Sequence, residues 1–132
     1  MSGSTWLRLG AMLGGLAVAA GAFGAHGLKD RMDARALEVF ETAAKYQMYH
    51  ALALLAVGLL ALMGRTGASL SFAGWSFLIG TLIFSGTLYA LALTGIRWLG
   101  AITPIGGVFL ILGWLALAVA AGAGPKVEAV EV

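Results

Sequence analysis

Cysteine is absent from the chain, and charged residues make up only 11% of it. The first absence excludes disulfides, thiolate metal sites and thiol catalysis. The second excludes an ordinary soluble domain, in which about 25% of residues are charged. A chain that is 61% hydrophobic could not cover its own surface in water. A basic stripe with interleaved aromatic residues is also lacking, so we expect no nucleic-acid partner.

Most of the chain falls into four uncharged runs: residues 9–25, 46–64, 66–96 and 98–125. A helix needs about 20 apolar residues to cross ~30 Å of hydrocarbon, and these runs lack the alternation of barrel strands. We therefore predict an all-α polytopic membrane protein, with residues 1–132 forming one domain of four antiparallel transmembrane helices in the lipid bilayer. The predicted spans are residues 7–25, 46–63, 70–93 and 103–122.

The segment 28–45 carries most of the charge. Asp33 is suited to cap a helix, and we expect an amphipathic helix over residues 34–46 that continues into the second span. Solvation explains its charged face, and the functional alternative is a docking surface for an unknown protein partner or for anionic lipid. The charged side chains of that face recur three or four residues apart: Arg35, Glu38, Glu41 and Lys45.

Small residues recur at four-residue spacing in the first span, as Gly10 with Gly14 and Gly21 with Ala25. Such pairs let helices approach closely, either within one bundle or between copies of a chain. We expect packing within the bundle. We also expect a homo-oligomer, because the small-residue faces exceed what four helices need, and Gly10 and Gly14 are candidates for its interface. Trp6 has the position of an interfacial aromatic residue.

The start of the fourth helix has two interpretations. Proline suits the first helical position and threonine caps well, so Thr103 and Pro104 favour a start at Pro104. In the alternative, the helix begins at Trp98 and is kinked at Pro104.

The two histidines define the first candidate site. His26 ends the first predicted span and His50 lies one turn into the second, so we expect both rings near the same membrane surface. The predicted polar cluster consists of His26, Tyr46, Gln47 and His50, with Glu41 within reach. Satisfaction of backbone groups is favoured over a ligand or proton site, and no metal site is predicted because metals usually need three or four ligands.

A second candidate site consists of polar side chains in the third and fourth spans. Their hydroxyls are ordinary groups for bonding between helices, and the functional alternative is the polar lining of a solute path. The residues concerned are Ser85, Tyr89 and Thr103.

Four segments together carry a family resemblance. They are GAFGAH at 21–26, YQMYHALA at 46–53, FSGTLYALALTG at 84–95 and ITPIGG at 102–107. With them the chain resembles the YgdD/YwdK-like family of small bacterial inner-membrane proteins, domain-of-unknown-function family four-two-three. The resemblance covers nearly the whole chain. It implies a four-span plasma-membrane protein, and it implies no activity and no catalytic residues.

Motifs of common enzyme classes are absent, including G-x-S-x-G, H-E-x-x-H and the phosphate-binding loops. The uncharged runs also lack the intramembrane charges of pumps and coupled transporters. We therefore predict a protein of unknown biochemical activity that is non-enzymatic, structural or interacting, and that self-associates. One alternative is a passive conduit or carrier for a small neutral solute. Another is a protein that binds haem or another cofactor through His26 and His50.

Orientation rests on the distribution of basic residues. Five lie on the side of the loop 28–45, and three lie on the side of the termini. The positive-inside rule then places the loop in the cytoplasm and both termini outside. The five are Lys29, Arg31, Arg35, Lys45 and Arg97, and the three are Arg8, Arg65 and Lys126.

Overall fold

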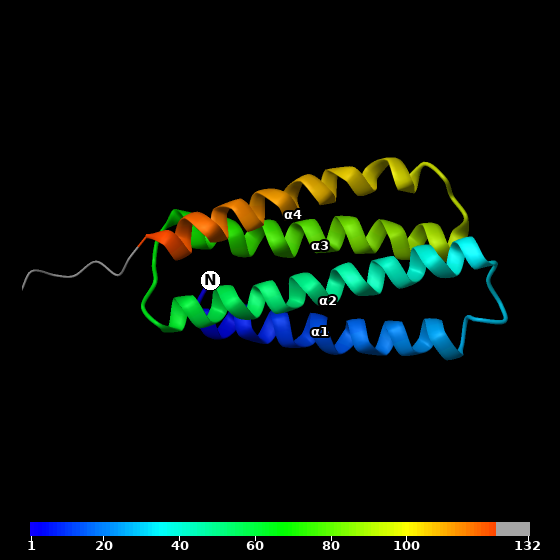
Figure 1. Cartoon of the computed structure of the whole chain (residues 1–132), viewed down its shortest axis with the longest axis horizontal. Coiled ribbons are helices and arrows are strands. Elements are labelled where there is room, and N and C mark those ends of the chain that lie inside the picture. The colour runs from blue at the N-terminus through cyan, green and yellow to red at the C-terminus, as the bar shows by residue number, and fades with distance from the viewer. Residues whose placement is uncertain (124–132) are drawn as a thin grey trace, which may run out of the picture.

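The computed structural model describes residues 1–123, and this part of the chain consists of long helices joined by short connections (Figure 1). The helices are α1 Gly3–His26, α2 Ala34–Leu62, α3 Ala68–Thr94 and α4 Leu99–Gly122. Residues 1–123 contain no strand. Each helix is long and apolar enough to cross a membrane, which confirms the predicted all-α class with four spans.

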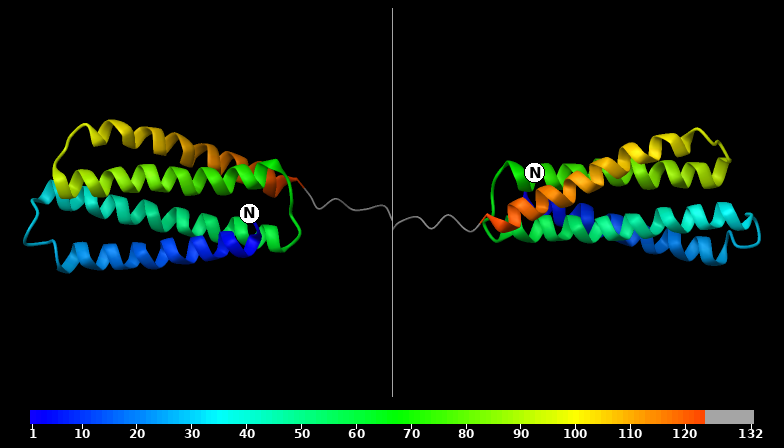
Figure 2. Two further views of the ribbon diagram at one scale, coloured as in Figure 1. Left: turned by 180° about the vertical axis from the view of Figure 1, so that it is seen from behind. Right: turned by 45° about the horizontal axis from the view of Figure 1, so that its top comes forward.

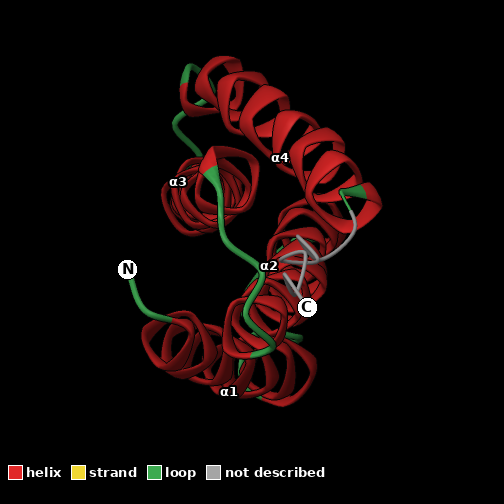
Figure 3. Cartoon of the chain, turned by 90° about the vertical axis from the view of Figure 1, so that its left-hand side faces the viewer, coloured by secondary structure: helices red, strands yellow, loops and turns green. Residues whose placement is uncertain are grey.

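Consecutive helices run in opposite directions and pack as two hairpins, α1 with α2 and α3 with α4 (Figures 1 and 2). Contact between α2 and α3 joins the hairpins, whereas α4 packs mainly on α3 and touches α2 at few places. Seen along the helices, α4 crosses obliquely, and its C-terminal end lies nearer to α2 than its N-terminal end does (Figure 3). The two hairpins therefore leave one side of α2 and α4 open to the surroundings.

Local interactions fix the helix ends. The Asp33 side chain caps α2 as predicted, accepting a hydrogen bond of 2.7 Å from the backbone N–H of Ala36. Gly95 ends α3 with a φ of 72°, a left-handed conformation that favours glycine. Arg65, between α2 and α3, donates to the carbonyl of Ala123 just beyond α4, where a cation complements the helix dipole.

α2 is one uninterrupted helix of 29 residues, so its charged N-terminal part does continue into the second span. This part lies beside the end of α1, since Phe40 packs against Gly24. Glu41 follows Phe40 by one residue and Lys45 follows it by five, so both are level with the last turns of α1. The charged N-terminal turns of α2 therefore pack beside the C-terminal turns of α1.

Gly10 and Gly14 face α2. A Cβ atom added at Gly10 would lie 2.8 Å from the carbonyl oxygen of Ala51, and one at Gly14 would lie 3.7 Å from the Ala51 Cβ. The pair therefore serves the close approach of α1 to α2, as the packing interpretation expected. Gly10 is thereby buried within the chain, whereas the expected interface between copies stays a prediction.

Trp6 is an anchor of the core near the start of α1. Its side chain is only 2% exposed, and its ring packs against Gly74 and edge-on to Trp75 of α3. Because α1 otherwise packs mainly on α2, this residue ties the first helix to the second hairpin. The buried core around it includes Leu54, Val57, Phe77 and Leu110.

The structure decides how α4 begins. The helix starts at Leu99, so Pro104 lies inside it and not at its first position. Thr103 caps no helix. Its hydroxyl lies 2.7 Å from the hydroxyl of Thr87 in α3, and this bond helps to hold α4 against α3 where proline lacks an N–H.

Candidate functional site

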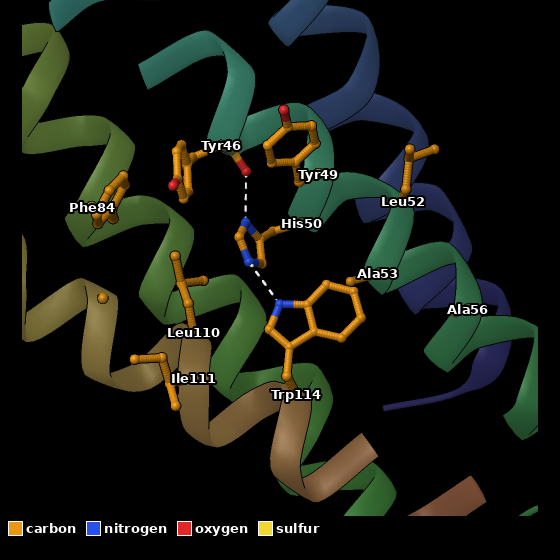
Figure 4. A pocket seen from close by; sticks show the side chains of 11 residues that line it. Tyr46, Tyr49, His50, Leu52, Ala53, Ala56, Phe84, Leu110, Ile111 and Trp114 are labelled. Carbon is orange, nitrogen blue, oxygen red and sulfur yellow. Dashed lines mark hydrogen bonds between the residues drawn. The ribbon is translucent and has the colours of Figure 1, made fainter. Parts of the chain in front are cut away.

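His50 lies in the middle of α2 and is only 4% exposed. Its Nδ1 is 2.7 Å from the Tyr46 carbonyl oxygen, and its Nε2 is 3.0 Å from the indole Nε1 of Trp114 in α4 (Figure 4). An indole N–H can only donate, so Nε2 accepts and Nδ1 carries the proton that is donated to Tyr46. The imidazole is therefore neutral, has both nitrogens paired, and links α2 to α4.

His26 is not part of this arrangement. It is exposed at the last position of α1, where Gly24 packs against Phe40. Phe40 precedes His50 by ten residues, which is about 15 Å of helix, so the two rings lie at different depths. The predicted cluster therefore does not include His26. The expectation failed because α2 already runs beside α1 from Ala34, which puts His50 in mid-helix.

Gln47 connects three helices and is 6% exposed. Its Nε2 donates to the carbonyl oxygen of Leu13 in α1 at 2.8 Å, and its Oε1 accepts from the Tyr89 hydroxyl in α3 at 2.7 Å. Four residues along α3, the Ser85 hydroxyl donates to the carbonyl of Ala43 in α2 at 2.8 Å. A buried polar network therefore fixes α1, α2 and α3 relative to one another.

The residues predicted as a polar lining occupy two different helix contacts. Ser85 and Tyr89 bond across the contact of α2 with α3, and Thr103 bonds to Thr87 across the contact of α3 with α4. The structure does not bring the three hydroxyls together along a common path. Their geometry is that of hydrogen bonds between packed helices.

The other members of the predicted cluster lie close in sequence but face different neighbours. Gln47 faces α1 and α3, whereas His50 faces α4. The Tyr46 ring lies against Phe84 of α3, with 4.8 Å between ring centroids. Glu41 is exposed and one turn or more away along α2. Within residues 1–123, no three His, Asp or Glu side chains come together as metal ligands would.

A groove of about 780 Å³ opens between α2 and α4 beside the hydrogen bond of His50 with Trp114 (Figure 4). It faces outward, since Tyr49, Leu52 and Ile111 are 49%, 55% and 62% exposed. The groove exists because α4 packs on α3 and leaves α2 beside it largely uncovered. The lining residues are Tyr46, Tyr49, His50, Leu52, Ala53, Ala56, Phe84, Gly107, Leu110, Ile111 and Trp114.

Trp114 was not among the site residues predicted from the sequence, although one feature of the sequence indicated its role. A tryptophan inside an apolar run needs a partner for its indole N–H, and few polar side chains on other helices were available. His50 is such a side chain, but the two residues are 64 positions apart. Only the placement of α4 against α2 shows that they meet.

Known proteins resemble this chain over most of its length. The family model described as protein of unknown function, DUF423, matches residues 20–107. A UPF0382 membrane protein of Staphylococcus epidermidis is 52% identical over 115 residues, which are 87% of this chain and 93% of the relative. The UPF0382 membrane protein YwdK of Bacillus subtilis is 48% identical over 116 residues, or 88% and 94% of the two chains. No solved structure matches the chain.

Proposed function

The chain belongs to the DUF423 family of membrane proteins, and from that membership we propose a non-enzymatic structural or interaction protein that self-associates in the membrane. The resemblance seen in the sequence is thereby confirmed, and so is the class of membrane protein, because the relatives are named as such and the chain has four helices able to span a bilayer. The family description names no activity. The finer assignment therefore rests on the polar interior and the outer surface.

The use of the interior polar groups supports a non-enzymatic role. Gln47, Ser85 and His50 each form hydrogen bonds that connect neighbouring helices. A catalytic site needs groups that converge on a substrate and remain free to exchange protons or attack. Here the same groups hold the helices together, which is the structural role that polar groups have in a scaffold protein.

The outward face of α1 carries the proposal of self-association. Ala11, Gly15 and Ala19 follow one another at four-residue spacing, and all three are exposed. A Cβ atom added at Gly15 would meet nothing within 4 Å, so this glycine serves no packing among residues 1–123. Small residues at this spacing let two helices approach until their backbones touch. Within the chain α1 packs mainly on α2, so its opposite face is available to a second copy.

The test is the substitution Gly15→Leu, with energy transfer between two labelled populations of the chain in lipid vesicles. A leucine side chain on the open face would hold two α1 helices apart, and we expect the apparent dissociation constant to rise at least about tenfold, or about 1.4 kcal/mol. The matched control is Gly86→Leu on α3, where an added Cβ also meets nothing within 4 Å. That variant should assemble like the unmodified chain.

Two results would contradict the proposal. One is an unmodified chain that stays monomeric at every ratio of protein to lipid. The other is an equal loss of energy transfer in Gly15→Leu and Gly86→Leu, since that would show a general effect of a bulky side chain and not an interface at α1.

The location that we propose is the bacterial inner (plasma) membrane, with the segment 28–45 on the cytoplasmic side and both termini outside. In support, the connections 27–33 and 95–98 lie at one end of the bundle, and residue 1 and residue 123 lie at the other (Figure 1). Basic residues are more numerous at the first end, as cytoplasmic loops require. Lys126, one of the three at the second end, lies outside the described residues.

A further inference from the structure

The groove between α2 and α4 has the size and lining of a site for one hydrocarbon chain. Its volume of about 780 Å³ lies within the roughly 300–1,000 Å³ of typical small-molecule sites. From Tyr46 to Ala56 it follows α2 for ten residues, or about 15 Å, which is half of a ~30 Å hydrocarbon core.

Polar atoms lie at one end of the groove. Tyr46 and Tyr49 occupy the end farther from Trp114, and their hydroxyls are the oxygen-bearing side chains there (Figure 4). Apolar side chains line the remainder, apart from the paired nitrogens of His50 and Trp114. An occupant with an apolar tail and a polar group at its loop-side end would match this distribution.

Charged residues continue the same face of α2 beyond the tyrosines. Glu41, Lys45 and Tyr49 recur at four-residue spacing and are all exposed, so they form a row on the outer side of the helix. Beyond the loop-side end of the groove this row presents the ammonium of Lys45 and then, one turn of about 5.4 Å further, the carboxylate of Glu41. A long lysine side chain also extends toward the membrane surface.

From this order we propose that the groove binds one acyl chain of a zwitterionic aminophospholipid. The lipid phosphate pairs with Lys45, and the terminal ammonium of the headgroup pairs with Glu41. Charge-assisted hydrogen bonds of both kinds are the strong ones in proteins. A lipid with only negative charge would place its headgroup against the Glu41 carboxylate, whereas a phosphate followed by an ammonium meets opposite charges in the correct order.

The test uses quenching of Trp114 fluorescence by brominated acyl chains in phosphatidylcholine vesicles. Trp114 lines the groove, and its signal is isolated as the difference between the unmodified chain and Trp114→Phe. Brominated phosphatidylethanolamine should quench at a mole fraction about fivefold lower than brominated phosphatidylglycerol does. Lys45→Gln and Glu41→Gln should each reduce this preference, whereas Lys29→Gln in the exposed loop should leave it unchanged.

A second variant tests the groove itself. Ala56→Phe would place a ring in the groove and should abolish the difference in Trp114 quenching between the two brominated lipids. Its control is Leu82→Phe, on an outer position of α3 that is 60% exposed and lies outside the groove. Helical circular dichroism shows whether Ala56→Phe folds. If it does not fold, the proposal is tested in the unmodified chain alone, by the ratio of the mole fractions at which the two brominated lipids quench Trp114.

Three outcomes would overturn the proposal. Equal quenching by both lipids would mean that Trp114 meets only bulk lipid. A preference for phosphatidylglycerol that Glu41→Gln does not change would make the headgroup assignment wrong. Crosslinks between copies through Tyr49, with quenching absent, would mean that another copy of the chain covers the groove. None of these outcomes depends on the α1 interface, so this proposal and the proposed self-association can fail separately.

Discussion

Replacement of Gln47 by leucine should destabilise the bundle, because the side chain forms two hydrogen bonds to other helices. One goes to the Leu13 carbonyl in α1 and one comes from the Tyr89 hydroxyl in α3, at 2.8 Å and 2.7 Å. Hydrogen bonds between helices in membrane proteins contribute about 0.6 kcal/mol on average and up to about 1.7. Gln47→Leu should therefore lower the free energy of unfolding by about 1.2 kcal/mol, and Tyr89→Phe should lower it by about 0.6.

The double variant gives the sharper result. The bond between Gln47 and Tyr89 is lost in both single variants, so its contribution would be counted twice if the effects simply added. We expect the double variant, Gln47→Leu with Tyr89→Phe, to be no less stable than Gln47→Leu alone. Its free energy of unfolding should therefore be about 0.6 kcal/mol higher than the sum of the two single effects predicts. The double variant should be slightly more stable than Gln47→Leu if the Tyr89 hydroxyl, which Gln47→Leu leaves without a partner, destabilises that variant.

The measurement is equilibrium unfolding in mixed detergent micelles, followed by far-ultraviolet circular dichroism. Tyr49→Phe serves as the control, since Tyr49 is 49% exposed on the outer side of α2, and its effect should add to that of Gln47→Leu. Additive effects of Gln47→Leu and Tyr89→Phe would refute the network. So would a gain in stability on Gln47→Leu, because it would mean that an apolar side chain serves better at this position.

Two further predictions concern the packing of α4 and the orientation of the chain. Gly106→Ala should cost about 1–3 kcal/mol of stability, because its Cβ would lie 2.5 Å from the backbone nitrogen of Phe84, whereas Gly107→Ala, with its nearest contact at 3.7 Å, should gain up to about 1 kcal/mol. The same unfolding measurement checks this pair, and similar values for both variants would show that α3 and α4 do not approach so closely. A C-terminal reporter that is active only in the cytoplasm should be silent, and its activity would reverse the proposed orientation.

The sequence by itself determined the class of the protein and the number of its spans. Hydrocarbon demands that each crossing segment be helical and apolar over about 20 residues, and this requirement can be tested on each segment alone. The same local logic predicted the Asp33 cap and the continuation of the charged helix into α2. It left the start of α4 open, because proline is tolerated inside a membrane helix when threonine and neighbouring helices satisfy the backbone.

Only the tertiary structure decided which polar groups meet. The side chains of His50 and Gln47 could be recognised as unusual in the sequence, but their partners, Trp114 and Tyr89, lie 64 and 42 positions away. Which partner is reached depends on how each helix is rotated about its axis and where it is placed along its neighbour. Neither quantity is contained in the composition of a single span. The depth of His26 relative to His50 was misjudged for the same reason, since it depends on how far α2 overlaps α1.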